Sequence, residues 1–218
     1  MAALSLLSPL FLIIAAAIKI DSDGSVFFKQ KRLTKNGTVF HMYKFRSMVV
    51  GAEKMGAGLF NYENDPRVTR VGRFLRHSSL DELPQLINVL KGEMSLVGPR
   101  PCVDGELGDY ETLNVRYKKR FTVLPGMTGY AQVCGRNDIS WDEKVTLDNA
   151  YIALFKKYGV WIDIKILFKT AVNILAHRDI YEKKSDAHLD DAQSAEISMR
   201  EIIEKAHAAE AENDEELK

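Results

Sequence analysis

The chain has 218 residues, of which 46% are hydrophobic and 28% charged, enough for one domain of ordinary size with extensions. Its formal net charge is zero, but residues 186–218 hold 11 acids and 3 bases, which leaves 27 bases against 19 acids elsewhere. This basic body suits an anionic partner such as a phosphate, a nucleic acid or an acidic membrane surface. Two cysteines, Cys102 and Cys134, exclude a disulfide framework, lack metal-ligand spacing and favour a reducing, cytosol-facing compartment.

Residues 2–18 carry no charge and consist mainly of Ala, Leu, Ile and Phe. As a helix they would rise about 25 Å, just short of a comfortable membrane span. Pro9 follows Ser8, and proline removes a backbone donor, so we expect a bend there. No basic region precedes the run, and no convincing cleavage site follows it, which argues against a secretory signal. We predict a segment that enters one leaflet and returns; the alternative is a buried core helix.

Two strands joined by a tight turn are predicted next. Residues 26–32 and 38–46 are rich in Val, Phe and Tyr, and Lys35-Asn36-Gly37 carries a hairpin turn signal. The two-residue period of a strand places Lys44 and Arg46 on one face. These cations either protect a solvated strand edge or face an anionic ligand.

The most informative segment is His77-Ser78-Ser79-Leu80-Asp81-Glu82-Leu83-Pro84-Gln85, which places two carboxylates side by side. Pro84 is tolerated only in the first turn of a helix, so we predict a helix that begins near Leu80 or Asp81 and ends at Gly92. Arginine recurs every third residue just before it, from Arg67 to Arg76, either as a polar helix face or as a phosphate cradle.

Asp81 and Glu82 would then lie at a helix N-terminus, where free amides favour negative charge. One interpretation is structural, with Asp81 as the cap or with Ser79 and Glu82 as a capping box. The other is catalytic: a carboxylate beside arginines could attack phosphorus, with a divalent ion bound by the acidic pair relieving the repulsion.

Three later segments carry further signals. Gly98-Pro99-Arg100-Pro101 is a rigid turn that would hold Arg100 in a fixed direction. The glycine-rich residues 125–137 add the donors Gln132, Arg136 and Asn137, which suit a nucleotide or a sugar. Residues 160–175 predict a basic amphipathic helix, able to rest on a membrane or on the core, and residues 186–218 predict an acidic helical tail.

Taken together, these segments resemble the bacterial sugar transferase family, the monotopic polyprenyl-phosphate phosphoglycosyl transferases. The matching pieces are GSVFFKQKRL, YKFRSM, DPRVTRVGRFLR, SLDELPQLINVLKGEMSLVGPRP, PGMTGYAQVCGRNDISW and LDNAYI, over roughly residues 4–180. The resemblance is to the minimal form of the family. Seven residues precede Ser8, fewer than family members usually carry, so either the chain is truncated or its membrane dip is shallow.

The resemblance implies an α+β fold, helix-rich with small β-hairpin elements. Residues 1–20 would form a re-entrant membrane helix broken at Ser8-Pro9, residues 21–185 the catalytic domain, and residues 186–218 a tail outside the resemblance. The tail could dock on the basic body or pair with another copy, giving a homo-oligomer. Lys19, Lys29, Lys31 and Arg32 would keep the protein on the cytoplasmic face of the bacterial inner membrane.

The activity implied is transfer of a sugar-1-phosphate from a UDP-sugar to polyprenyl (undecaprenyl) phosphate, with Mg²⁺, release of UMP and a covalent intermediate, as the first membrane step of glycoconjugate synthesis. The aspartate nucleophile falls on Asp81 and its glutamate neighbour on Glu82, which would also hold the metal. The expected substrate-binding residues are Lys44, Arg46, Arg76, Arg100, Gln132, Arg136, Asn137 and Asp148. Membrane lipid is an expected partner and nucleic acid is not.

Two other functions remain open at this point. A membrane-surface glycosyltransferase that uses a nucleotide-sugar would release UDP in place of UMP. A catalytically silent, membrane-anchored binding protein would have no need of the acidic pair that Asp81 and Glu82 form.

Overall fold

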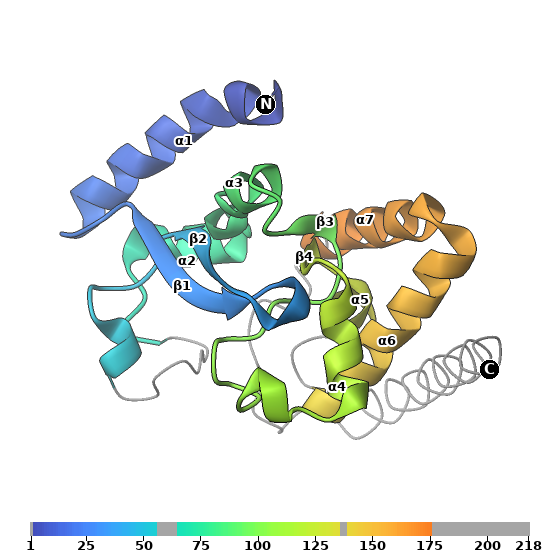
Figure 1. Cartoon of the computed structure of the whole chain (residues 1–218). Helices are drawn as coiled ribbons and strands as arrows, with labels where there is room; N and C mark the ends of the chain where they lie inside the picture. The colour runs from blue at the N-terminus through green and yellow to red at the C-terminus, as the bar shows by residue number, and fades with distance from the viewer. Residues whose placement is uncertain (1, 56–64, 136–138, 176–218) are drawn as a thin grey trace, which may run out of the picture.

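The computed structural model describes residues 2–55, 65–135 and 139–175, so the acidic tail, Arg136 and Asn137 lie outside it. Its helices and strands are α1 (Ala2–Asp21), β1 (Phe27–Leu33), β2 (Val39–Phe45), α2 (Arg70–His77), α3 (Gln85–Leu90), β3 (Ser95–Val97), α4 (Val115–Lys119), β4 (Gly126–Thr128), α5 (Tyr130–Gly135), α6 (Trp141–Tyr158) and α7 (Val160–Leu175) (Figure 1). The predicted mixture of helices with small sheets is confirmed.

α1 runs through Ser8 and Pro9 as one helix, so the segment is not divided into two helices there, and its re-entry into a membrane stays a prediction. Proline at position 9 lacks the N–H that would bond the carbonyl oxygen of Ser5. The hydroxyl of Ser8 donates to that same oxygen at 2.8 Å, so the acceptor left by the proline is satisfied. Within the described residues no helix combines the length and the apolar character needed to cross a membrane.

The predicted hairpin is confirmed almost to the residue. β1 and β2 pair antiparallel in a register that sets Phe28 opposite Lys44 and Leu33 opposite Val39, and Asn36 and Gly37 adopt positive φ in the turn. The C-terminal half of α1 packs on this hairpin and on α2 through a buried cluster of Ile14, Ile18, Phe45 and Leu75. Lys44 is thereby attached to a rigid element.

The end of α1 is fixed by two polar contacts. The carboxylate of Asp21 accepts from the backbone N–H of Val71, in the first turn of α2, at 2.9 Å. The guanidinium of Arg46 donates to the carbonyl oxygen of Ile18 in the last turn of α1 and to those of Ser22 and Asp23 just after it. α1 is therefore joined both to α2 and to the end of β2.

The second half of the chain is organised around α6. Nine consecutive residues of α6, Val145 to Ala153, are buried, and α4, α5 and α7 contact it. The parallel strands β3 and β4 lie beside these helices, and their glycines allow the two backbones to touch. A Cβ on Gly126 would lie 2.1 Å from the backbone nitrogen of Gly98, and a Cβ on Gly129 would lie 2.1 Å from the carbonyl oxygen of Gly98. The glycines at positions 126 and 129 therefore allow close approach of the backbone at Gly98.

The predicted helix over residues 160–175 is confirmed as α7. Several of its large apolar side chains are exposed, with Trp161 at 69% and Phe168 at 72%. The outer side of α1 is similar, with Leu6, Leu12 and Ile13 exposed. In Figure 1 α1, α3 and α7 all lie toward the upper edge of the molecule as viewed.

Candidate functional site

The acidic pair lies in a tight turn ahead of α3. Leu80–Glu82 form a single 3₁₀ turn, and α3 begins only at Gln85, after Pro84. The expectation of one helix from Leu80 to Gly92 is therefore wrong. The physical reason is local: Pro84 has no N–H to bond the carbonyl of Leu80, which accepts instead from the N–H of Leu83 at 3.2 Å, and the fixed φ of Pro84 suits the start of a new helix.

The capping box that was one structural interpretation of the pair is not formed in this turn. The side chain of Ser79 makes no capping hydrogen bond. Oε1 of Glu82 instead accepts from Nζ of Lys44 at 2.8 Å and from Nη2 of Arg100 at 3.0 Å. The strand, the acidic turn and the Pro-Arg-Pro turn after β3 therefore meet at one carboxylate oxygen.

Asp81 differs from its neighbour although the two are adjacent. Its residue surface is only 9% exposed, and its carboxylate accepts no hydrogen bond from the residues that the structure describes. Burial raises the pKa of Asp81 to about 6; Lys44 opposes that rise and the charge of Glu82 adds to it. Burial acts in the same direction on Glu82, but Lys44 and Arg100 outweigh it and hold the pKa of Glu82 well below its usual range. Of the two carboxylates, Asp81 is therefore the one that is not paired with a cation at hydrogen-bonding distance among the described residues.

The arginine run 67–76 does not act as one group. Arg67 forms a buried ion pair with Asp65 at 2.6 Å, and Nε of Arg76 donates to Oγ of Ser47 at 2.8 Å. Arg76 lies close enough to Asp81 to lower the pKa of that carboxyl. Of this run, Arg76 is the member placed at the site.

The other predicted substrate-binding residues are dispersed. Arg46 is engaged with the carbonyls at the end of α1, and Nε2 of Gln132 donates to the carbonyl of Met127 at 3.3 Å. Asp148 is 1% exposed and forms an ion pair with Arg120 at 2.9 Å inside the core. Their assignment to substrate binding stays a prediction, as does that of Arg136 and Asn137.

Arg32 is a site residue that the sequence reasoning missed. Its Nη1 donates to the carbonyl of Pro101 at 2.6 Å, and its Nε and Nη2 donate to Oε1 of Gln30. Burial lowers the pKa of Arg32 to about 10, and the nearby charge of Arg100 acts in the same direction. The two-residue period of a strand could have indicated it. Arg32 lies on the same face of β1 as Phe28, and Phe28 is paired with Lys44, so Arg32 and Lys44 share one face of the hairpin.

The charges at the site suit an anionic ligand. Two carboxylates are surrounded by four cations, namely Arg32, Lys44, Arg76 and Arg100. A cluster with this excess of positive charge, built around a buried carboxylate that accepts no hydrogen bond within the described ranges, is the kind of site that enzymes use to act on phosphate groups.

The donor set also fits a magnesium ion. Mg²⁺ is commonly held by one or two carboxylates together with substrate phosphates, and it needs no larger set of protein ligands. Among the residues that the structure describes, no side chain donates to the carboxylate of Asp81, and the two cations bind Oε1 of Glu82, which leaves its Oε2. No group of three or more acidic, histidine or cysteine ligands occurs in the described part of the chain.

Comparison with known proteins agrees with this class of site. The family model described as "Bacterial sugar transferase" matches residues 1–177, and the chain belongs to that family. The exopolysaccharide production protein ExoY of Rhizobium meliloti is 42% identical over 193 residues, which cover 82% of this chain and 83% of that protein.

Two longer relatives carry more specific names. The undecaprenyl-phosphate galactose phosphotransferase of Salmonella typhimurium is 44% identical over 178 residues, 75% of this chain and 36% of the relative. The UDP-glucose:undecaprenyl-phosphate glucose-1-phosphate transferase of Xanthomonas campestris is 44% identical over 178 residues, 79% of this chain and 36% of the relative. The chain thus spans about a third of these two proteins.

Proposed function

We propose that this protein transfers a sugar-1-phosphate from a UDP-sugar to polyprenyl phosphate and releases UMP. The observation that supports the proposal is the buried carboxylate of Asp81, which has no hydrogen-bonding partner in the described chain. The adjacent Glu82 forms ion pairs with Lys44 and Arg100. The names of the Salmonella and Xanthomonas relatives, which specify undecaprenyl phosphate and galactose or glucose transfer, support it.

The chemistry follows from the positions of the charges. Asp81 attacks the phosphorus that carries the sugar, the bond to the uridine monophosphate oxygen breaks, and UMP leaves with that electron pair. The sugar-phosphoryl group is then held on Asp81 until a phosphate oxygen of the lipid attacks the same phosphorus and frees the carboxylate. Arg100 and Lys44 orient the diphosphate and balance its charge.

Magnesium fits into this proposal through the acidic pair. Asp81 and Glu82 would hold it, and when bound it supplies positive charge that relieves the repulsion between the carboxylates and the donor diphosphate. Glu82 keeps Lys44 and Arg100 in place by accepting from both at one oxygen.

The exposed apolar side chains of α1 and α7 support a place at a lipid surface. A soluble monomer seldom exposes residues such as Leu12, Trp161 and Phe168 together. We infer that these helices lie in the membrane interface on the cytoplasmic side, where the polyprenyl phosphate head group is accessible.

Product identification tests the proposed function. Purified protein in lipid nanodiscs is incubated with Mg²⁺, undecaprenyl phosphate and a panel of UDP-sugars that begins with UDP-galactose and UDP-glucose. We expect UMP and a lipid-linked sugar diphosphate from at least one donor. Release of UDP would support the alternative, a membrane-surface glycosyltransferase, and absence of any nucleotide product across the panel would contradict both.

The activity should also depend on pH through Asp81. Because burial raises the pKa of Asp81 to about 6, the carboxylate is protonated below that pH and kcat/KM should rise as the pH increases through it. Lys44, Glu82, Arg76 and Arg100 are the charges that face it.

A substitution at Arg76 sharpens this pH test. Arg76 lowers the pKa of Asp81, so Arg76→Met should move the acid limb of the profile to higher pH. His77→Gln changes the neighbouring residue and serves as the control, which should leave the limb in place. A limb that moves with His77 and not with Arg76 would show that another group controls it.

A further inference from the structure

The carbonyls of the turn that carries Arg100 accept hydrogen bonds from other segments of the described chain. Pro99 and Pro101 have no N–H, so they cannot form the usual bonds within a turn. Instead, four consecutive carbonyls accept from other segments: that of Pro99 from the N–H of Gly126 at 2.9 Å, that of Arg100 from Arg120 at 2.7 Å, that of Pro101 from Arg32 at 2.6 Å, and that of Cys102 from the N–H of Leu33 at 3.1 Å.

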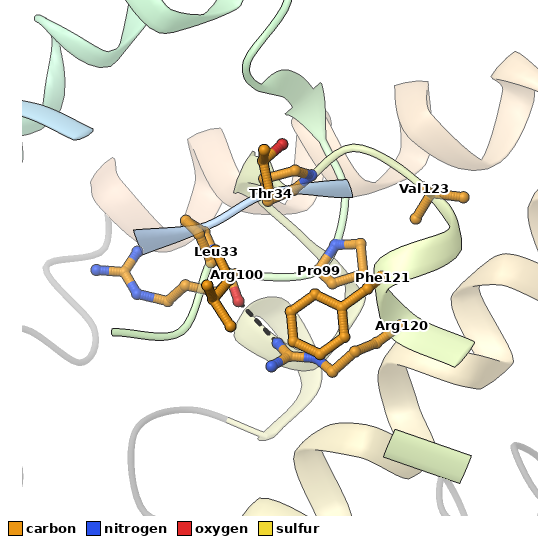
Figure 2. A pocket seen from close by; sticks show the side chains of 9 residues that line it. Leu33, Thr34, Pro99, Arg100, Arg120, Phe121 and Val123 are labelled. Atoms are coloured by element: carbon orange, nitrogen blue, oxygen red, sulfur yellow. Dashed lines mark hydrogen bonds between the residues drawn. The ribbon is translucent and has the colours of Figure 1, made fainter. Parts of the chain in front are cut away.

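Arg120 is the more deeply buried of the two side chains among these donors, since Arg32 is only partly buried. It is 4% exposed, and its Nη2 bonds both the carbonyl of Arg100 and Oδ2 of Asp148, the latter at 2.9 Å. Its Nε donates to the same carboxylate oxygen at 3.0 Å, and its guanidinium lies 5.1 Å from the ring of Trp141. Figure 2 shows the bond from Arg120 to the main chain of Arg100 at the edge of a small pocket, with Pro99 and Phe121 beside it.

We propose that Arg120 and Asp148 act as a positioning pair, which sets the direction of the Arg100 side chain by fixing the carbonyl of Arg100. Arg120 was not predicted as a site residue from the sequence. Its burial keeps it from substrate, whereas the side chain of Arg100 is 40% exposed and reaches Glu82. The geometry assigns to Asp148 the role of anchoring Arg120, in place of the substrate contact that the family resemblance implies for it.

The direction of the Arg100 side chain matters because its guanidinium donates to Oε1 of Glu82 at 3.0 Å. A hydrogen bond keeps its strength only within a narrow range of lengths and angles. A guanidinium that is held by Glu82 and extends from a fixed backbone loses less freedom when it binds a phosphate. If the carbonyl of Arg100 is released, the turn can rotate, and the side chain no longer meets Glu82 and the donor diphosphate together.

A first measurement does not require activity. Amide hydrogen exchange of the peptide covering residues 95–103 is compared, without substrate, in the wild type and in Arg120→Met. Loss of a charge-assisted hydrogen bond should accelerate exchange there at least about tenfold. The control is Arg116→Met, which removes an arginine that pairs with Asp142 on α6 and touches no part of the turn, and which should leave this peptide unchanged. Unchanged exchange in Arg120→Met would overturn the proposal.

A second measurement, which rests on the proposed function, is a double-mutant cycle in the transferase assay. Arg120→Met should lower kcat/KM about 100-fold in the wild-type background, the loss typical of a misplaced catalytic group. If Arg120 acts through Arg100, the same change should cost less than about twofold when Arg100→Ala is already present. An equal loss in both backgrounds would mean that Arg120 acts in another way and would overturn the proposal.

Milder variants keep the test decisive if Arg120→Met does not fold. Arg120→Lys retains a charge and Asp148→Asn retains an acceptor, so both should show smaller changes of the same kind in exchange and in the cycle. If these variants fold and change neither, the proposal is wrong. If the wild type transfers no sugar phosphate but the exchange result holds, the positioning pair stands and the proposed function fails.

Discussion

Asp81→Asn is expected to lower sugar-phosphate transfer by at least about 10⁴-fold, because an amide cannot form the covalent phosphosugar intermediate. The asparagine has almost the same shape, and Asp81 accepts no hydrogen bond in the described chain that the change would break. The variant should therefore be folded, with an unfolding midpoint no lower than that of the wild type. Asp104→Asn makes the same chemical change at an exposed position and should leave turnover as it is.

The intermediate itself can be trapped. Wild-type protein is incubated with Mg²⁺ and a reactive UDP-sugar but without lipid acceptor, then digested for mass spectrometry. A mass increase of one sugar phosphate should appear on the peptide that contains Asp81 and be absent from Asp81→Asn. Label on a different peptide, or normal turnover by the asparagine variant, would contradict the assignment.

The second large effect is expected at Arg100. Arg100→Ala removes a guanidinium that lies 3.0 Å from Glu82 and is exposed enough to reach a bound diphosphate. Loss of orientation and of charge stabilisation together should lower kcat about 10²–10³-fold. Arg100→Lys keeps the charge without the planar fork of donors and should recover part of the loss.

Two observations give this prediction its controls. Thermal unfolding should change little, since the backbone of the Pro-Arg-Pro turn keeps its outside donors in Arg100→Ala. Arg116→Ala removes another arginine from the basic body, one bound to Asp142 and Thr146, and should leave kcat unchanged. Near-normal kinetics in Arg100→Ala would assign this arginine to structure.

Local patterns predicted those parts of the fold that depend on neighbours in the sequence. The hairpin of β1 and β2 was predictable because alternating residues and an Asn-Gly turn act over a few positions. α7 was predictable from its apolar period. α1 was predicted as a helix, but a rule based on proline alone does not include the Ser8 hydroxyl, which donates to the carbonyl of Ser5 that Pro9 leaves without its usual donor.

The site was predictable in its residue types and not in its contacts. Asp81 and Glu82 were found because two adjacent acids before a proline are unusual, yet the 3₁₀ turn that carries them, preceded by a left-handed Ser79, was not predicted. The partners of Arg100 come from distant segments: Arg120 is 20 residues away, and Arg32 reaches the next carbonyl across 69 residues. Such pairings are set by the packing of the hairpin on the turn, which no local period encodes.

The burial of Asp81 also has a consequence for thermostability. A carboxyl whose pKa is raised to about 6 in the fold, from an ordinary value near 3.8, favours the folded state most when it is protonated. Its contribution is complete below the ordinary pKa and is lost as the pH rises through about 6. At neutral pH the molecule therefore carries an ionised group that its fold disfavours, and a screen for heat-resistant variants at that pH would enrich substitutions at Asp81. Heat resistance selected in this way would be a sign of lost activity.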